Sequence, residues 1–176
     1  MPEKRNTKGK KTGFLPFLPL TFATPGAALA ILGLVLPFAS LLTKNPATEA
    51  IIRESRTLAA WANQNDAMRE VTGEGFRFFG AAFGFAWAVA VGACVTLLLL
   101  LWERLAPTET RPRWYVAGAG VLLALASVGF FLFAVLFSVS AGGELSRVLL
   151  SVGAYLTLSG GLLTGVSSFI AVRRSL

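Results

Sequence analysis

The side chains that could do chemistry within the apolar part of this chain are mostly hydroxyls. Four of them lie close together in its last apolar stretch, at Ser159, Thr164, Ser167 and Ser168. A row of hydroxyls on one helix could line a polar path across a membrane. The more common role of such a hydroxyl is to bond the carbonyl of the preceding turn or to contact a neighbouring helix. We therefore interpret these residues as packing residues and keep the polar path as the alternative.

Activated nucleophiles and metal ligands are scarce in this sequence. The chain has no histidine, one cysteine and one aspartate, Asp66. Ser159 precedes two glycines but has no histidine within the chain to activate it. Cys94 lies in the middle of an apolar stretch and is interpreted as a small apolar packing residue. Imidazole ligation of metal, haem or pigment, an aspartyl dyad and disulfide exchange are excluded within this chain.

Ionisable residues are absent from the middle of every long apolar stretch. Arg77, Glu103 and Arg147 lie at the edges, where a long side chain extends towards the membrane surface. Proton and ion relays usually place an ionisable group inside a span. Nucleotide-binding motifs are absent too, and the cysteine and tryptophan signatures of claudins and tetraspanins are missing. The sequence therefore indicates no catalytic activity and assigns no family.

Composition places the chain in the membrane class. Of its 176 residues, 55% are hydrophobic and 14% are charged, whereas soluble domains carry about 25% charged residues. The formal net charge of +7 comes from basic residues at the ends of apolar stretches, which is typical of orientation signals and contacts with anionic lipid. We predict an all-α integral membrane protein in one domain, residues 14–176, preceded by a basic tail at residues 1–13. Nucleic acid is not an expected partner.

Four transmembrane helices are predicted from the apolar stretches. Pro16 and Pro19 interrupt the apolar segment before the first of these helices and should resist helix formation, and Thr24–Pro25 is interpreted as its N-cap and first position. Pro37 should kink it, because proline removes a helical hydrogen bond. The expected spans are Pro25–Leu42, Phe78–Leu101, Tyr115–Val139 and Val148–Val172.

The long polar connection between the first two spans is predicted to contain an amphipathic helix outside the membrane, at Pro46–Met68. Ile51, Ile52 and Leu58 fall near one face, and Glu49 and Arg53 form a favourable pair four residues apart. This helix should lie on the membrane or on a partner. Trp61 is interpreted as a membrane-interface anchor, with a packing contact as the alternative.

Small residues recur every four positions along two of the predicted spans. Residues four apart share a helix face, so each set forms a groove that lets another helix backbone approach closely. We predict that both grooves face protein, either each other or the first and third spans, and that a groove facing outward would dock a partner subunit. The third span presents Gly120, Ala124 and Ser127 on one face. The two stripes are Gly80, Gly84, Ala88 and Gly92 in the second span, and Gly153, Thr157, Gly161 and Gly165 in the fourth.

Aromatic and basic residues predict the membrane boundaries and the orientation. The expected interface anchors are Trp102, Trp114, Tyr115, Arg173 and Arg174. With four spans, the tail, the link between the second and third spans and the C-terminus share one side, which holds ten of the sixteen basic residues. The positive-inside rule then predicts a multi-pass protein of the cell (inner) membrane, or an organellar one, with both termini cytoplasmic.

These observations predict a non-catalytic accessory or structural subunit of a larger membrane complex. Its expected partners are the lipid bilayer and other membrane subunits, in a hetero-oligomer or alternatively a homo-oligomer. The alternative functions are a small oligomeric transporter or channel and, less favoured, an enzyme acting on lipid or quinone. No cofactor is predicted. An aromatic stripe could still contact lipid, pigment or quinone without a histidine ligand, and it consists of Phe76, Phe79, Phe83 and Trp87.

Overall fold

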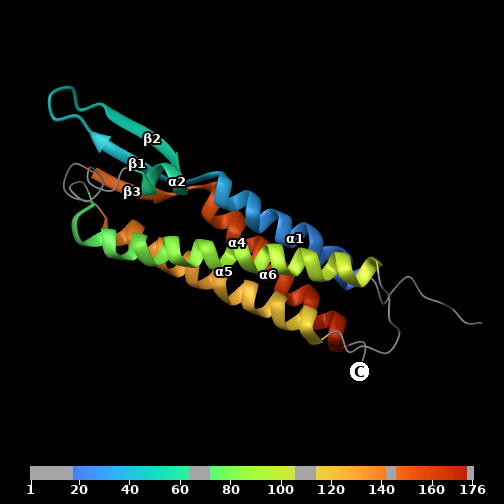
Figure 1. Cartoon of the computed structure of the whole chain (residues 1–176). Coiled ribbons are helices and arrows are strands. Elements are labelled where there is room, and N and C mark those ends of the chain that lie inside the picture. Colours follow the sequence, from blue (N-terminus) through green and yellow to red (C-terminus); the bar gives the residue numbers. More distant parts are fainter. Residues whose placement is uncertain (1–17, 64–71, 106–113, 142–145, 174–176) are drawn as a thin grey trace, which may run out of the picture.

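The computed structural model describes residues 18–63, 72–105, 114–141 and 146–173. Four long helices lie side by side and a small antiparallel sheet covers one end of them (Figure 1). We call these four helices the helical body. They are α1 (Leu18–Val35), α4 (Phe76–Leu105), α5 (Trp114–Ser140) and α6 (Val152–Arg173).

Three of these helices are long and apolar enough to cross a membrane, within Gly73–Glu103, Trp114–Ser140 and Val152–Ala171. This is consistent with a location in a membrane. The first helix has a shorter apolar segment in its described part, Thr21–Val35. Its full 18 residues correspond to about 27 Å, close to the hydrocarbon thickness of about 30 Å. Four spans therefore remain a prediction.

The first helix differs from its expected boundaries at both ends. It begins at Leu18, so Pro19 occupies the first turn, where backbone N–H groups have no helical partner anyway, and Pro25 lies inside the helix instead of opening it. The helix ends at Val35, and Pro37 starts strand β1. The kink expected at Pro37 is wrong because a residue before proline, here Leu36, disfavours the helical conformation.

The predicted amphipathic helix at Pro46–Met68 is wrong within the described residues, and the expectation of an all-α fold is wrong with it. Strand β1 (Pro37–Lys44) pairs with β2 (Ile51–Thr57), which is followed by the five-residue helix α2 (Leu58–Ala62). The β-branched residues Ile51, Ile52 and Thr57 suit a strand. Residues 64–68 of the predicted helix lie outside the described residues.

A tight turn replaces the helix start expected at Pro46. The Asn45 side-chain oxygen accepts a hydrogen bond from the Ala47 N–H at 2.9 Å, and the Asn45 N–H bonds the Ala50 carbonyl at 2.9 Å. Glu49 adopts a φ of 56° and pairs with Lys44 at 3.6 Å, so it does not make the helical pair expected with Arg53. The turn therefore closes a β-hairpin.

The sheet is completed from the far end of the chain. Strand β3 (Ser146–Leu150) pairs antiparallel with β1, so the strand order is β2-β1-β3. Val148–Leu150, predicted as the start of the fourth span, therefore belong to this strand, and the last helix begins at Val152. A short 3₁₀ turn, η1 (Gly73–Gly75), leads into α4 at the same end.

Aromatic side chains join the sheet to the helical body. The Trp61 ring lies edge-on to Phe137 with centroids 5.4 Å apart, and the Phe38 ring lies 5.6 Å from that of Phe130. Phe79 is also part of this cluster. Trp61 is only 1% exposed, so its interpretation as a membrane-interface anchor is wrong and the packing alternative holds. The sheet is thus fixed on the helices by a buried core.

Candidate functional site

Helix α6 occupies the centre of the packing and presents small residues to two neighbours. A Cβ added at Gly153 would lie 2.5 Å from the Gly33 carbonyl oxygen of α1, and one at Gly160 would lie 2.4 Å from the Ala30 nitrogen. Real side chains do not approach backbone atoms this closely. Glycine is therefore required for the observed approach of α6 to α1.

The second face of α6 lies against α5. A Cβ added at Gly161 would lie 2.0 Å from the Ser127 hydroxyl, and one at Gly165 would lie 2.6 Å from the Ala124 Cβ. The fourth-span stripe predicted from the sequence therefore divides between two partners. Gly153 and Thr157 face α1, while Gly161 and Gly165 face α5.

Side-chain hydroxyls occupy the space beside glycines along both contacts of α6. We call the space left by the missing Cβ of a glycine a glycine notch. The Thr164 hydroxyl would lie 2.5 Å from a Cβ at Gly26, and the Ser168 hydroxyl would lie 2.5 Å from a Cβ at Gly120. Thr164 donates to the Gly160 carbonyl at 2.8 Å and is 3.3 Å from the Ala23 carbonyl of α1. The same pairing of a hydroxyl with a glycine recurs two helical turns away, at Thr157 beside Gly33 and at Ser127 beside Gly161.

These contacts show what the hydroxyls of the last span do in the folded chain. Thr157 and Thr164 are buried and bond the carbonyl four residues earlier, and Ser159 does the same at the surface. The buried hydroxyls of Ser127 and Ser168 have no hydrogen-bond partner among the described residues. They occupy the space left by a glycine on the facing helix, as a packing role predicts.

The small stripe of α4 has different surroundings. Gly80, Gly84 and Ala88 are exposed, and a Cβ added at Gly80 or Gly84 would meet nothing within 4 Å. Gly92 is half-buried, and its added Cβ would make ordinary contact with Leu123 at 3.6 Å. The structure thus brings Gly92 to α5, whereas in the described chain Gly80 and Gly84 have nothing within 4 Å of an added Cβ and Ala88 is exposed. We call Gly80, Gly84 and Ala88 the open face of α4.

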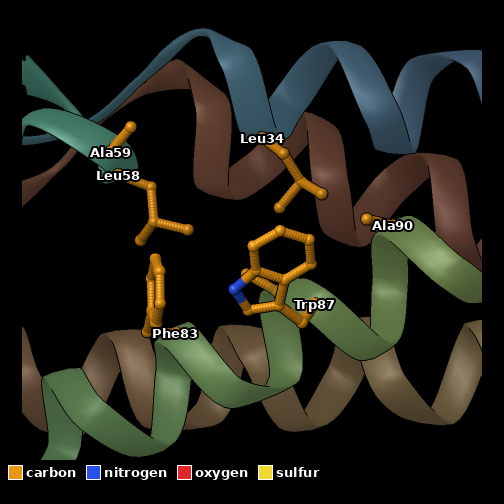
Figure 2. Close-up of a pocket in the computed structure, with 7 residues that line it drawn as sticks. Leu34, Leu58, Ala59, Phe83, Trp87 and Ala90 are labelled. Carbon is orange, nitrogen blue, oxygen red and sulfur yellow. The ribbon is translucent and has the colours of Figure 1, made fainter. Parts of the chain in front are cut away.

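The seam between α1 and α4 contains two apolar cavities. One of about 170 Å³ lies towards the sheet, where Leu34 of α1 points towards Trp87 of α4, and Leu58 of α2 points towards Phe83 (Figure 2). The other, of about 210 Å³, lies towards the opposite end and is lined by Thr24, Leu97, Leu100 and Leu101. The aromatic residues of the predicted stripe lie in two different surroundings. Phe79 is buried in the core, whereas Phe83 and Trp87 line the cavity.

The predicted interface anchors gather at the end of the helical body away from the sheet (Figure 1). Trp102 is 62% exposed and Trp114 is 66% exposed. Tyr115 is half-buried and donates a hydrogen bond to the Glu103 carboxylate. Arg173 is the last residue of α6, and Arg174 lies outside the described residues. The two tryptophans have the exposure expected of membrane-interface residues.

Groups that could perform chemistry do not converge among the described residues. No cluster of three histidine, cysteine, aspartate or glutamate side chains occurs there, and Cys94 is exposed on α4. Sequence reasoning missed Gly26, Gly33 and Gly160, although the spacing of seven residues between Gly26 and Gly33 matches that between Thr157 and Thr164. It also missed the sheet. No protein-family model matches this chain, and no curated protein matches it in sequence.

Proposed function

We propose that this protein is a non-catalytic accessory subunit of a larger membrane complex, and that a partner helix packs on the open face of α4. The observation that supports this is the contrast within one chain. The small residues of α6 are enclosed by α1 and α5, whereas Gly80, Gly84 and Ala88 have an equivalent spacing and are exposed among the described residues. Glycine costs roughly 1 kcal/mol of helix stability relative to alanine. A close contact between these glycines and a partner helix would offset that loss of stability.

The cavity beside the open face extends this surface. Phe83 and Trp87 lie one helical turn apart on α4, and Trp87 is 63% exposed. Large apolar side chains beside a small-residue groove are the pattern of a helix-packing surface, where the groove admits a backbone and the flanking rings contact its side chains. Alternatively, a lipid or quinone occupies this aromatic cavity.

The experiment is gentle detergent extraction of the tagged full chain, followed by identification of any stoichiometric membrane subunit. Gly84→Leu should release that subunit. Gly118→Leu is the matched control, because Gly118 is an exposed glycine of α5 whose added Cβ also meets nothing within 4 Å. The proposal fails if no subunit co-purifies, or if both variants retain it equally.

A transporter or channel is the second candidate. It would need polar groups facing a path, and the unpartnered hydroxyls of Ser127 and Ser168 are its best support. The proposal favours packing because these hydroxyls fill glycine notches and both seam cavities have mainly apolar linings. A homo-oligomer that conducts ions or solutes in liposomes would favour this candidate instead.

We further propose four spans in the cell membrane, with both termini cytoplasmic and the sheet on the outer side. This rests on the sequence positions of the basic residues, ten of which lie in the N-terminal tail, in the link between α4 and α5 and at the C-terminus. On a Cys94-free background, an impermeant thiol reagent added outside should label a cysteine at Thr48 in the hairpin turn and not one at Thr108. The reverse labelling would invert the orientation.

A further inference from the structure

One face of the sheet points away from the helical body. Residues paired across antiparallel strands project to the same side. Leu41 is paired with Val148, which is 2% exposed and packs in the core. The neighbouring positions project to the opposite side, and Leu149 among them is 46% exposed. We call this second side the outer sheet face, and it consists of Ser40, Leu42, Lys44, Ile51, Arg53, Ser55, Arg147 and Leu149.

Two arginines cross this face in a single row. Leu42 on the central strand is paired with Arg53 on β2 and with Arg147 on β3. Adjacent strands are about 4.8 Å apart, so the backbones of the two arginines are separated by about 10 Å. Both arginines are exposed. Each comes from an edge strand, and they are ninety-four residues apart in sequence.

The charge of the outer sheet face is not balanced by its own residues. Among the positions just named there is no carboxylate. Of the neighbouring acids in the described chain, Glu54 projects to the opposite side and pairs with Arg56. Glu49 pairs with Lys44 at the hairpin end of this face, so it balances the lysine and not the two arginines. Neither Arg53 nor Arg147 forms an ion pair with a described carboxylate.

The guanidinium of Arg53 is held over the central strand. Its Nη2 lies 3.4 Å from the Ser40 hydroxyl, and that hydroxyl is 2.8 Å from the hydroxyl of Ser55. Ser40 is fully buried although it projects to this side. The side chain of Arg53 therefore leans diagonally over β1, from the row of Leu42 towards Ser40. This contact already orders the side chain in part, which lowers the entropy cost of binding a ligand.

We propose that the outer sheet face docks a carboxylate-bearing segment of a partner protein outside the membrane. Arginine binds a carboxylate through two parallel N–H groups, and Leu42 and Leu149 supply apolar contact between and beside the two arginines. The hairpin extends beyond the ends of the helices (Figure 1), which places this face away from the lipid around the helical body. This inference rests on the proposed accessory role and adds the chemistry of the partner.

The test uses the full chain in nanodiscs of uncharged phosphatidylcholine. The probe is a fluorescein-labelled peptide of alternating glutamate and serine, eight residues long, and its binding is measured by anisotropy at low salt. The same peptide with glutamine in place of glutamate is the probe control. We expect the glutamate peptide to bind at least five times more tightly than the glutamine peptide, with affinity falling as salt is raised.

The variant Arg53→Gln/Arg147→Gln should weaken binding of the glutamate peptide at least fivefold. Arg56→Gln is the matched control, since Arg56 lies on the same strand but projects to the opposite side, and it should change binding less than twofold. Unchanged thermal unfolding of each variant shows that the sheet is intact. If the double variant unfolds, Arg53→Lys/Arg147→Lys replaces it, and this variant should bind two- to threefold more weakly because lysine cannot form the paired contact.

Equal affinity for the two peptides, or equal loss in the double variant and in Arg56→Gln, would overturn the proposal. So would arginine-dependent co-sedimentation with phosphatidylglycerol vesicles without peptide binding, which would identify an anionic lipid as the ligand. None of these readouts depends on the open face of α4. The peptide result can therefore fail while Gly84→Leu still releases a partner, and the reverse also holds.

Discussion

Helices α4 and α6 carry similar patterns of small residues and use them differently. On α6 every predicted small position contacts α1 or α5, and Gly153 and Gly161 leave no room for a Cβ. On α4, Gly80 and Gly84 lie in open surroundings. The difference arises because α6 lies between two neighbours, whereas α4 packs mainly on α5 and only partly on α1. Four-residue spacing therefore indicates that close approach is possible without identifying the partner.

The facing helices explain the contrast further. Gly26 and Gly33 on α1 are seven residues apart, as are Thr157 and Thr164 on α6, and each glycine receives a threonine. A seven-residue repeat keeps two helices in register along their length. The open face of α4 has no such reciprocal set in the described chain. Complementarity between two helices, and not spacing on one, distinguishes an internal contact from an external surface.

The largest effect is expected from filling the glycine notch of α6 that lies closest to the backbone of a neighbouring helix. Gly160→Leu would place a Cβ 2.4 Å from the Ala30 nitrogen and 2.5 Å from the Gly26 carbonyl oxygen. Backbone atoms cannot move aside without separating the helices, so we expect a loss of roughly 3–5 kcal/mol or failure to fold. Thermal or denaturant unfolding in detergent measures it. Gly118→Leu should be nearly neutral, and a similar loss in both variants would remove the contrast between enclosed and open glycines.

A smaller effect is expected where a side chain, and not the backbone, fills the notch. Gly161→Ala would place its Cβ 2.4 Å from the Ser127 Cβ, and we expect a loss of about 1–3 kcal/mol from overpacking. Ser127→Gly should recover part of it, because the double variant exchanges the two partners. A double-mutant cycle measures the coupling. Additive losses would show that Ser127 and Gly161 do not interact.

The hydroxyl contribution should be modest. Thr164→Val keeps the shape of the side chain and removes the donor that bonds the Gly160 carbonyl within α6 at 2.8 Å and lies 3.3 Å from the Ala23 carbonyl of α1. Hydrogen bonds between membrane helices contribute about 0.6 kcal/mol on average, so we expect a loss of about 0.5–1 kcal/mol. Ser127→Ala should be neutral or slightly stabilising because that hydroxyl has no hydrogen-bond partner in the part of the chain that the structure describes. A loss for Ser127→Ala larger than for Thr164→Val would indicate an unrecognised polar contact and favour a transport path.

A small change of opposite sign is expected on α4. Gly84→Ala introduces a Cβ into open space, so the isolated chain should be stabilised by up to about 1 kcal/mol through helix propensity. The same substitution should weaken assembly with the partner of the proposed complex. Parallel measurement of unfolding and co-purification separates the two effects. Destabilisation of the isolated chain by Gly84→Ala would show that this face is already occupied within the monomer.

Much of the helical layout could be predicted from the sequence. The uncharged stretches around Gly92 and Ser127 are long enough to span a membrane and correspond to α4 and α5. Their lengths follow from local composition, because a run of apolar residues satisfies its backbone hydrogen bonds only as a helix in lipid. The face of Gly120, Ala124 and Ser127 on the third span was also recognisable, since it follows from helical periodicity.

The sheet could not be predicted in the same way. Ile51 and Ile52 fit one face of a helix as well as they fit a strand, and Val148 continued an apolar stretch. Strand β1 forms by pairing with β2 and with β3. The residues of β3 that pair with β1 are more than one hundred positions away in sequence, as Val148 is from Leu41. Such non-local pairs leave little trace in local propensity. The row formed by Arg53 and Arg147 exists only through this pairing.

The sequence by itself determined which segments are apolar and long enough to form membrane helices, where the basic residues lie, and that small residues recur at helical spacing. These properties depend on side chains close together in the chain. The tertiary structure alone decided which small face is enclosed, that Trp61 is buried, and that Arg53 and Arg147 share a face. These depend on which elements become neighbours. That choice is made by the summed packing of α1, α5 and α6 and by strand pairing across the whole chain, and no single segment encodes it.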